Sequence, residues 1–298
     1  MPCHNPITAY RSRVVNPSGR RSLVFTKNEG FEDLEILVPC GQCIGCKLDR
    51  SLEWATRITH EASLHSKSSF VTLTYEDRHL PPNKSLRKKD AQDFMKRLRF
   101  FSDHPLRYYL CGEYGSEPYL LPNGKMTEGF MPHYHICLFG EDFSYDRVPY
   151  KTTPDGFPLW NSPSLSDRWG FGHCVIGDLT FETAAYTARY VTKKLTGPKA
   201  PSHYGLREPE FSLMSRRPGI GDDWLKKNVV DLENGLCWAS NGLTKIPKFY
   251  QKKLNQKKLL KLKFKQKKEA AKKLKQPNPY VLDDVQKAKF NLKKKKDL

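Results

Sequence analysis

Short strand-like runs that alternate with helical patterns constrain the fold of this chain more than any other feature. Three runs have the β-branched and aromatic content typical of strands: "SFVTLTY" (Ser69–Tyr75), "LRYYLCGEYG" (Leu106–Gly115) and "PHYHICLFG" (Pro132–Gly140). The run "GHCVIGDL" (Gly172–Leu179) predicts a further strand.

Helical patterns accompany these strands. Apolar residues recur every three or four positions over 48–62 and 89–101, and a helix is expected over 181–195. No Gly fingerprint of a βαβ unit joins the strands, so the pattern predicts an α+β fold with helices flanking an antiparallel sheet. The Pro, Ser, Asp and Trp content of residues 141–170 predicts irregular structure with at most a short helix at 165–169.

The charge of the chain is concentrated at one end. The net charge is +19, and residues 251–298 contain 18 lysines against four acidic residues. A lysine-rich tail of this kind favours a polyanionic partner, nucleic acid first, because Lys and Arg neutralise phosphates. A solvated, frayed helix without a partner has the same composition, so this alternative stays open.

The apolar pattern excludes a membrane protein at the level of the sequence. No apolar run approaches the roughly 20 residues that a membrane span needs, and the N-terminus lacks the apolar core of a signal peptide. We therefore expect a soluble, intracellular protein. In that compartment the eight cysteines are reduced thiols or metal ligands more readily than disulfides.

Two histidines share one face of a predicted strand. His133 and His135 are separated by one residue, so their side chains point the same way, about 6 to 7 Å apart at the backbone. The opposite face carries Tyr134, Ile136 and Leu138, which leaves the histidine face more polar or open. Together with Glu113 of the neighbouring strand, they would form an open site for a divalent cation. Alternatively, the histidines are satisfied in a half-buried strand and Glu113 pairs with a nearby base.

The predicted helix over 181–195 carries a polar stripe. Tyr186 and Tyr190 are four positions apart, and Lys193 and Lys194 follow one turn later. Tyrosine can act as a nucleophile that forms a covalent intermediate, provided that a cation or metal helps the phenol to ionise. Packing of the two rings in a core is the alternative.

A cysteine cluster precedes the first predicted helix. In "VPCGQCIGC", Cys40, Cys43 and Cys46 follow a C-x2-C-x2-C pattern, and Cys3 could supply a fourth thiolate to a tetrahedral Zn²⁺ ion. Reduced structural thiols are the alternative.

The ordered series "FVTLTY", "GEYG", "PHYHICLFG" and "YTARYVTKK" resembles the HUH endonuclease superfamily of rolling-circle replication initiators. The resemblance is closer still to the replication initiators of Microviridae, especially the gokushovirus-like branch. These proteins similarly pair "VPCGQCIGC" with a downstream "REPEFSLMSRRPGIG", here Arg207–Gly221. The resemblance covers most of residues 1–250.

The resemblance implies a division of the chain. Residues 1–66 would form an N-terminal cysteine-containing segment and helix, and residues 67–200 an HUH endonuclease core with an RRM-like sheet. Residues 201–250 would be a family-specific extension, and residues 251–298 a basic, helical, lysine-rich tail.

The resemblance also implies an activity. His133, His135 and Glu113 would hold Mg²⁺ or Mn²⁺ at the scissile phosphate, and Tyr186 and Tyr190 would attack it in turn, aided by the lysines. The products would be a 5′-phosphotyrosine link and a 3′-hydroxyl primer on viral single-stranded DNA, in the cytoplasm of a bacterial host.

The sequence lacks a Walker motif, so the implied partners include a host helicase and a host polymerase. The competing hypothesis is a non-enzymatic nucleic-acid-binding protein with a cysteine-zinc knuckle and a basic tail. The two hypotheses differ in whether the tyrosines lie near the histidine pair.

Overall fold

The computed structural model describes residues 3–254 and residue 264, apart from residues 18, 20, 116–128, 130, 196, 199, 231, 233, 234, 240 and 241. For residues 190–193 it describes the backbone only. The chain forms two compact units, one with the described residues of 1–50 and the other with those of 51–270. None of the helices in the described part combines the length and the apolar character that a membrane span requires.

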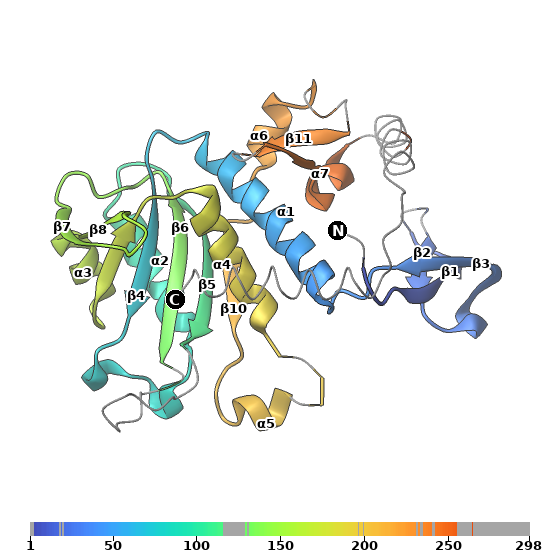
Figure 1. Ribbon diagram of the computed structural model, residues 1–298, viewed down its shortest axis with the longest axis horizontal. Helices are drawn as coiled ribbons and strands as arrows, with labels where there is room; N and C mark the ends of the chain where they lie inside the picture. The colour runs from blue at the N-terminus through green and yellow to red at the C-terminus, as the bar shows by residue number, and fades with distance from the viewer. Residues whose placement is uncertain are drawn as a thin grey trace. The chain divides into compact units, whose positions relative to one another are not determined.

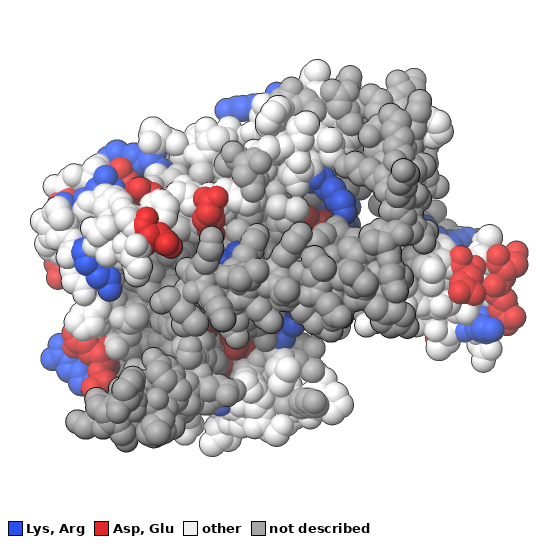
Figure 2. All heavy atoms as spheres, viewed as in Figure 1, with Lys and Arg blue, Asp and Glu red and all other residues white. Residues whose placement is uncertain are grey.

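The smaller unit contains an antiparallel sheet that the sequence patterns do not predict. Its strands are β1 (Ile7–Val15), β2 (Arg21–Val24) and β3 (Gly30–Val38), in the order β2-β1-β3. Charged residues interrupt the apolar alternation that marks a half-buried strand. Strand β3 exposes Glu32, Asp33 and Glu35 and has no Lys or Arg, and acidic side chains gather on this sheet in Figure 2.

The larger unit is built on an antiparallel sheet, which confirms the predicted α+β class. Within the described residues it is seven-stranded, in the order β10-β5-β6-β4-β9-β8-β7. The strands are β4 (Ser68–Thr74), β5 (Arg107–Tyr114), β6 (Pro132–Phe139), β7 (Val148–Thr152), β8 (Pro158–Asn161), β9 (Cys174–Gly177) and β10 (Phe211–Met214). The four strands predicted from the sequence are β4, β5, β6 and β9, and all four are confirmed.

Three strands of this sheet lie outside the sequence predictions. The expectation of irregular structure over 141–170 is wrong for β7 and β8, which form a hairpin at one edge of the sheet. Strand β7, "VPYKT", is exposed along its whole length, so no apolar alternation reveals it. At the other edge, β10 comes from the segment 201–250 and pairs with β5.

Helices cover both faces of the sheet (Figure 1). One face packs against α2 (Lys88–Phe100) and α3 (Pro163–Trp169). The other face packs against α4 (Phe181–Lys193) and the later turns of α1 (Ile44–Ala62). The helices predicted over 48–62, 89–101 and 181–195 are therefore confirmed, and α3 is the short helix expected at 165–169.

Alternation along β6 sends its side chains into two different cores. Tyr134, Ile136 and Leu138 pack with α2 and α3, as the sequence predicts. Cys137 and Phe139 point the other way and pack with α1 and α4. The histidine face is thus closed by helices over half its length, and only the end that carries His133 and His135 is left for polar groups.

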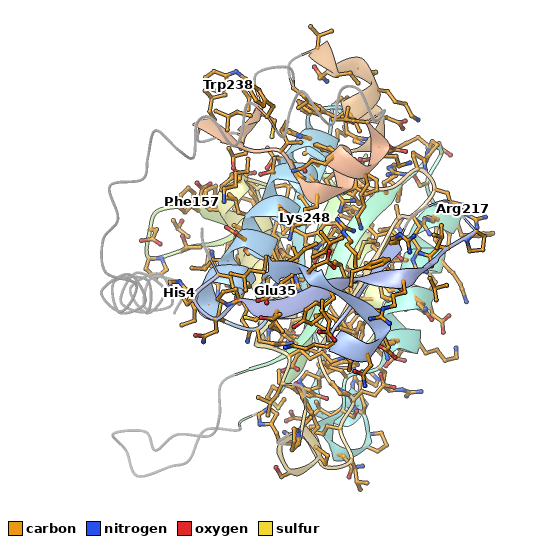
Figure 3. The ribbon with its side chains drawn as sticks, turned by 90° about the vertical axis from the view of Figure 1, so that its right-hand side faces the viewer. His4, Glu35, Phe157, Arg217, Trp238 and Lys248 are labelled. Carbon is orange, nitrogen blue, oxygen red and sulfur yellow. The ribbon has the colours of Figure 1, made fainter. Side chains whose placement is uncertain are left out.

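A small cluster follows the sheet. It is formed by α6 (Asp222–Lys227), β11 (Leu236–Ala239), β12 (Gly242–Lys245) and α7 (Lys248–Lys253), and the short helix α5 (Ala200–Tyr204) precedes β10. Trp238 projects from the β11–β12 hairpin and is 64% exposed (Figure 3). The lysine-rich tail lies outside the described residues, apart from residues 251–254 and the exposed Phe264.

Buried polar groups on α1 connect this cluster to the sheet. The guanidinium of Arg57 donates to the carbonyl oxygen of Ile220 through Nε (3.1 Å) and Nη2 (3.0 Å). Glu61 accepts from the backbone N–H of Gly221 (2.6 Å) and from Arg107 of β5. One helix therefore ties β5 to the C-terminal cluster by charge-assisted hydrogen bonds.

His60 extends this connection. Its ring stacks on Trp224 with centroids 3.5 Å apart, Nδ1 lies 3.0 Å from the Tyr250 hydroxyl, and Nε2 lies 2.5 Å from the Trp238 carbonyl oxygen. Because a carbonyl only accepts, Nε2 carries the proton and Nδ1 accepts from Tyr250. Both nitrogens have partners in the neutral ring, and burial lowers the pKa of His60 from 6.5 to about 4.

The protein should therefore lose stability on mild acidification. The pKa of His60 is lower in the folded chain than in the unfolded chain. The contribution of the neutral ring to the free energy of unfolding is therefore complete above pH 6.5 and falls as the pH drops toward 4. When the pH falls from about 7.5 to 5.5, we expect His60 to lower the free energy of unfolding, measured with urea, by about 1.4 kcal/mol. His60→Gln should remove that difference, whereas the exposed control His104→Gln should keep it. Equal pH dependence in wild type and His60→Gln would contradict the assignment.

Candidate active site

Strand pairing brings the predicted metal ligands together. In the β5–β6 ladder, Glu113 lies directly opposite His133, and Cys111 lies opposite His135. Glu113 Oε1 is 2.6 Å from His133 Nε2 and 3.4 Å from His135 Nε2. The structure thus gathers all three predicted residues at the end of the sheet face that α1 and α4 cover.

The two histidines are oriented by their other ring nitrogens. His133 Nδ1 lies 3.0 Å from the Met131 carbonyl oxygen, and His135 Nδ1 lies 3.0 Å from Thr72 Oγ1 on β4. Both Nε2 atoms therefore face Glu113. Metal-binding histidines commonly have a hydrogen-bond partner of this kind, which fixes the tautomer and the direction of the ring.

The contact between His133 Nε2 and Glu113 Oε1 is short for two atoms that can both carry lone pairs. The Met131 carbonyl oxygen can only accept, so His133 Nδ1 carries a proton. In a neutral ring, Nε2 then presents a lone pair to Glu113 Oε1 at 2.6 Å, where two lone pairs repel. The contact is stable only when a second proton or a metal cation lies between the two atoms.

The carboxylate is held in its ionised form. Glu113 is 3% exposed, and burial alone would raise its pKa. The hydrogen bonds and charges of His133 and His135 outweigh burial and lower the pKa of Glu113 below its usual value. A buried carboxylate that remains charged beside two imidazoles is a donor set that suits a divalent cation.

The spacing of the donor atoms also fits such an ion. One ligand atom from each of Glu113, His133 and His135 lies within 4.8 Å of the others. An ion bound about 2.1 Å from each ligand in octahedral geometry would hold adjacent ligand atoms about 3 Å apart. The observed separations of 2.6 and 3.4 Å lie on either side of that value. Three protein ligands leave coordination positions for substrate oxygens and water.

Helix α4 brings Tyr186 to this cluster. The Tyr186 and His135 rings contact edge to face, with centroids 5.1 Å apart. Phe70 of β4 stacks on His135 at 5.4 Å and meets Tyr186 at 6.2 Å, so it holds the two rings beside each other. A capping box between Thr180 and Thr183 fixes where α4 begins.

The remaining predicted residues of the stripe are described only in part. The backbone of Tyr190 and Lys193 continues α4, but their side chains lie outside the described part of the structure. Lys194 is exposed and ends the helix. Their roles stay predictions.

Two residues near the site were missed from the sequence. Thr72 lies opposite His135 in the β4–β6 ladder and contacts its Nδ1. Arg189 places its guanidinium 5.9 Å from the centre of the Tyr186 ring. Its position, three residues after Tyr186 on the same helix, was the available signal.

The predicted cysteine ligands belong to the smaller unit. The Sγ atoms of Cys3, Cys40, Cys43 and Cys46 all lie within 4.8 Å of one another. The structure thus brings Cys3, the fourth ligand suggested from the sequence, to the three cysteines of the C-x2-C-x2-C pattern.

Comparisons with known proteins agree on one family. The model of the family described as "Replication-associated protein ORF2/G2P" matches residues 68–195, a segment that contains the three candidate ligands and Tyr186. No solved structure has significant similarity to the chain.

Curated relatives come from small phages. Replication-associated protein ORF2 of Spiroplasma virus 4 is 34% identical over 231 residues, covering 73% of this chain and 67% of the relative. Replication-associated protein VP4 of Bdellovibrio phage phiMH2K is 30% identical over 266 residues, covering 84% and 76%. Replication-associated protein ORF4 of Chlamydia phage 1 is 32% identical over 166 residues, covering 53% and 38%.

Divalent cations should stabilise the folded chain through these ligands. An ion that binds the native state alone, at 100 times its Kd, adds about 2.7 kcal/mol to the free energy of unfolding. We expect Mn²⁺ to raise the Tm of the wild type and of His104→Ala, which changes an exposed loop histidine. His133→Ala and His135→Ala should lose the shift in differential scanning fluorimetry. An undiminished shift in both site variants would place the ion elsewhere.

Proposed function

We propose that this chain, which belongs to the Microviridae-like family of phage replication-associated proteins, initiates rolling-circle replication by nicking viral single-stranded DNA. The activity is that of an HUH-type DNA endonuclease and strand transferase. The contact between the Tyr186 and His135 rings is the observation that carries the proposal, because it joins a nucleophile to a metal-ligand cluster. A protein in which these residues merely pack has no need of a charged, buried Glu113 beside them.

Glu113, His133 and His135 are the residues that would hold Mg²⁺ or Mn²⁺. Such an ion, when bound, supplies a Lewis acid that polarises the scissile phosphate and neutralises its developing charge. The protein's own contribution is to keep Glu113 ionised and both Nε2 atoms aimed at one point.

Tyr186 is the proposed nucleophile. Its phenolic oxygen forms a bond to phosphorus while the bond from phosphorus to the 3′ oxygen breaks. The phenolic proton leaves, and the departing 3′ oxygen takes up a proton to become a hydroxyl that can prime synthesis. A phenol of ordinary pKa near 10 needs help to ionise, and Arg189, whose guanidinium lies 5.9 Å from the centre of the Tyr186 ring, is the proposed source of that help.

The link that results is a 5′-phosphotyrosine, so the energy of the phosphodiester is kept for resealing. Tyr190, one helical turn after Tyr186, is proposed to take part in the second transfer, and Lys193 and Lys194 to stabilise developing charge at the end of α4. Strand separation and synthesis are assigned to a host helicase and polymerase, since the sequence has no Walker motif.

Substitution of the tyrosines should show whether both act as nucleophiles. On a simple origin oligonucleotide with Mn²⁺, Tyr186→Phe and Tyr190→Phe should each leave some covalent nicking, and the double variant should have none. Phe keeps the packing of the ring and deletes only the hydroxyl. Tyr150→Phe, which changes an exposed residue of β7, is the matched control and should behave like the wild type.

The measurement is mass spectrometry of the trapped adduct after protease digestion. Nucleotide attached to Tyr186 or Tyr190 supports the proposal. An adduct on another residue, or nicking that persists in the double variant, would rule out the assignment.

The lysine-rich tail is proposed to bind DNA without reading its sequence. The deletion should begin after residue 254, because Tyr250 of α7 is buried in the C-terminal cluster. Removing residues 255–298 should weaken binding to all single strands and flatten the plot of log K against log salt, by about 0.7 for each phosphate that the tail neutralises. Preference for the origin should survive. A truncated chain with the full salt slope, measured by fluorescence anisotropy, would show that the tail does not bind DNA.

A further inference from the structure

The cysteine cluster lies where the chain enters and leaves the small sheet, next to the start of α1. Strands β1 and β3 are antiparallel and Ile7 pairs with Val38, so the segment before β1 and the segment after β3 come together. Cys3 and Cys40 lie in these two segments, and Cys43 and Cys46 lie at the start of α1. Figure 3 labels His4, the neighbour of Cys3, and Glu35 on β3. Segments that are distant in sequence thus contribute to one sulfur cluster.

The distance between sulfurs fits a metal rather than a disulfide. Cys43 Sγ and Cys3 Sγ are 3.8 Å apart, and all four Sγ atoms lie within 4.8 Å of one another. Four thiolates about 2.3 Å from a tetrahedral Zn²⁺ ion are separated by about 3.8 Å. A disulfide requires about 2.05 Å between its sulfurs.

Backbone N–H groups surround these sulfurs. The amides of Cys40, Cys43 and Cys46 donate to the Sγ atoms of Cys3 (3.2 Å), Cys40 (3.3 Å) and Cys43 (3.5 Å), respectively. Such bonds hold the three sulfurs in fixed positions, as hydrogen bonds to the ligands of a metal site do. Gly41 has a φ of +75°, which allows the tight turn between Cys40 and Cys43.

The described residues of the small unit bury few side chains. Within the described part of residues 1–50, the buried positions are Ala9, Tyr10, Ser12, Gly30 and Gly45. Apolar side chains such as Val14, Phe25 and Leu37 are more than half exposed. A three-stranded sheet with so little buried surface needs a staple such as a disulfide or a structural metal.

We propose that Cys3, Cys40, Cys43 and Cys46 bind one structural Zn²⁺ ion. Four protein ligands close the coordination sphere, so the ion takes no substrate and its role is to join the sheet to the start of α1. In this proposal the ion has a structural role, whereas the competing hypothesis gives the zinc knuckle a role in nucleic-acid binding.

Metal analysis of the full-length protein tests the proposal. After expression in zinc-supplemented medium and washing with EDTA, we expect about one zinc per chain by inductively coupled plasma mass spectrometry. Cys43→Ser should lower the zinc content at least tenfold. Two controls should keep it: Cys237→Ala, a cysteine outside the cluster, and His133→Ala, a candidate ligand of the other metal site. Wild-type protein without zinc, with iron instead, or with zinc that disappears in His133→Ala would overturn the proposal.

A second measurement uses the wild-type protein and tests the site even if Cys43→Ser fails to fold. Wild-type protein reconstituted with Co²⁺ should show the thiolate-to-cobalt charge-transfer absorption of a tetrahedral sulfur site. Its absence, or an intact mass that has lost the thiol hydrogens through disulfide formation, would contradict the site. Neither readout depends on DNA nicking, so the zinc proposal and the proposed function can fail separately.

Discussion

The candidate active site depends on the register of one pair of strands. Antiparallel pairing of β5 with β6 places Glu113 opposite His133, and alternation puts His135 on the same face. A slip of one residue would turn both histidines to the opposite face of the sheet. Tyr134, Ile136 and Leu138 resist that slip, because each is at most 1% exposed in the core formed with α2 and α3. The hydrophobic effect on one face thus fixes the polar geometry on the other.

Packing of α4 supplies the second half of the site. Ala184 and Ala188 are fully buried on α4, and Thr187 lies 3.5 Å from Cys137 of β6, so the helix approaches the sheet closely. This packing fixes the rotation of α4 and therefore the face that carries Tyr186. A larger residue in place of either alanine would move the tyrosine ring away from His135, although neither alanine is itself a candidate metal ligand.

The local helices and strands of this arrangement could be predicted from the sequence, but the contacts between distant segments could not. The sequence pattern identified β4, β5, β6 and β9 by their β-branched and aromatic content, and the main helices by their apolar periodicity. It missed β7, which is exposed along its length, and β8, which is only four residues long. It also missed the strands of the small unit, whose charges break the alternation. The spacing placed Tyr186 and Tyr190 on one stripe, but only helix packing decides that Tyr186 meets His135. Arg189 and Thr72 escaped notice because neither residue type marks a site by itself.

The central claim is that Tyr186 lies beside a metal ion held by Glu113, His133 and His135. A crystal structure of the full chain with Mn²⁺ and a non-cleavable origin oligonucleotide tests it most directly. The account predicts an ion about 2.0 to 2.2 Å from Glu113 Oε1 and from both Nε2 atoms, with the Tyr186 hydroxyl facing the bound phosphate. An ion held by other residues, or a Tyr186 hydroxyl turned away from the phosphate, would contradict the account.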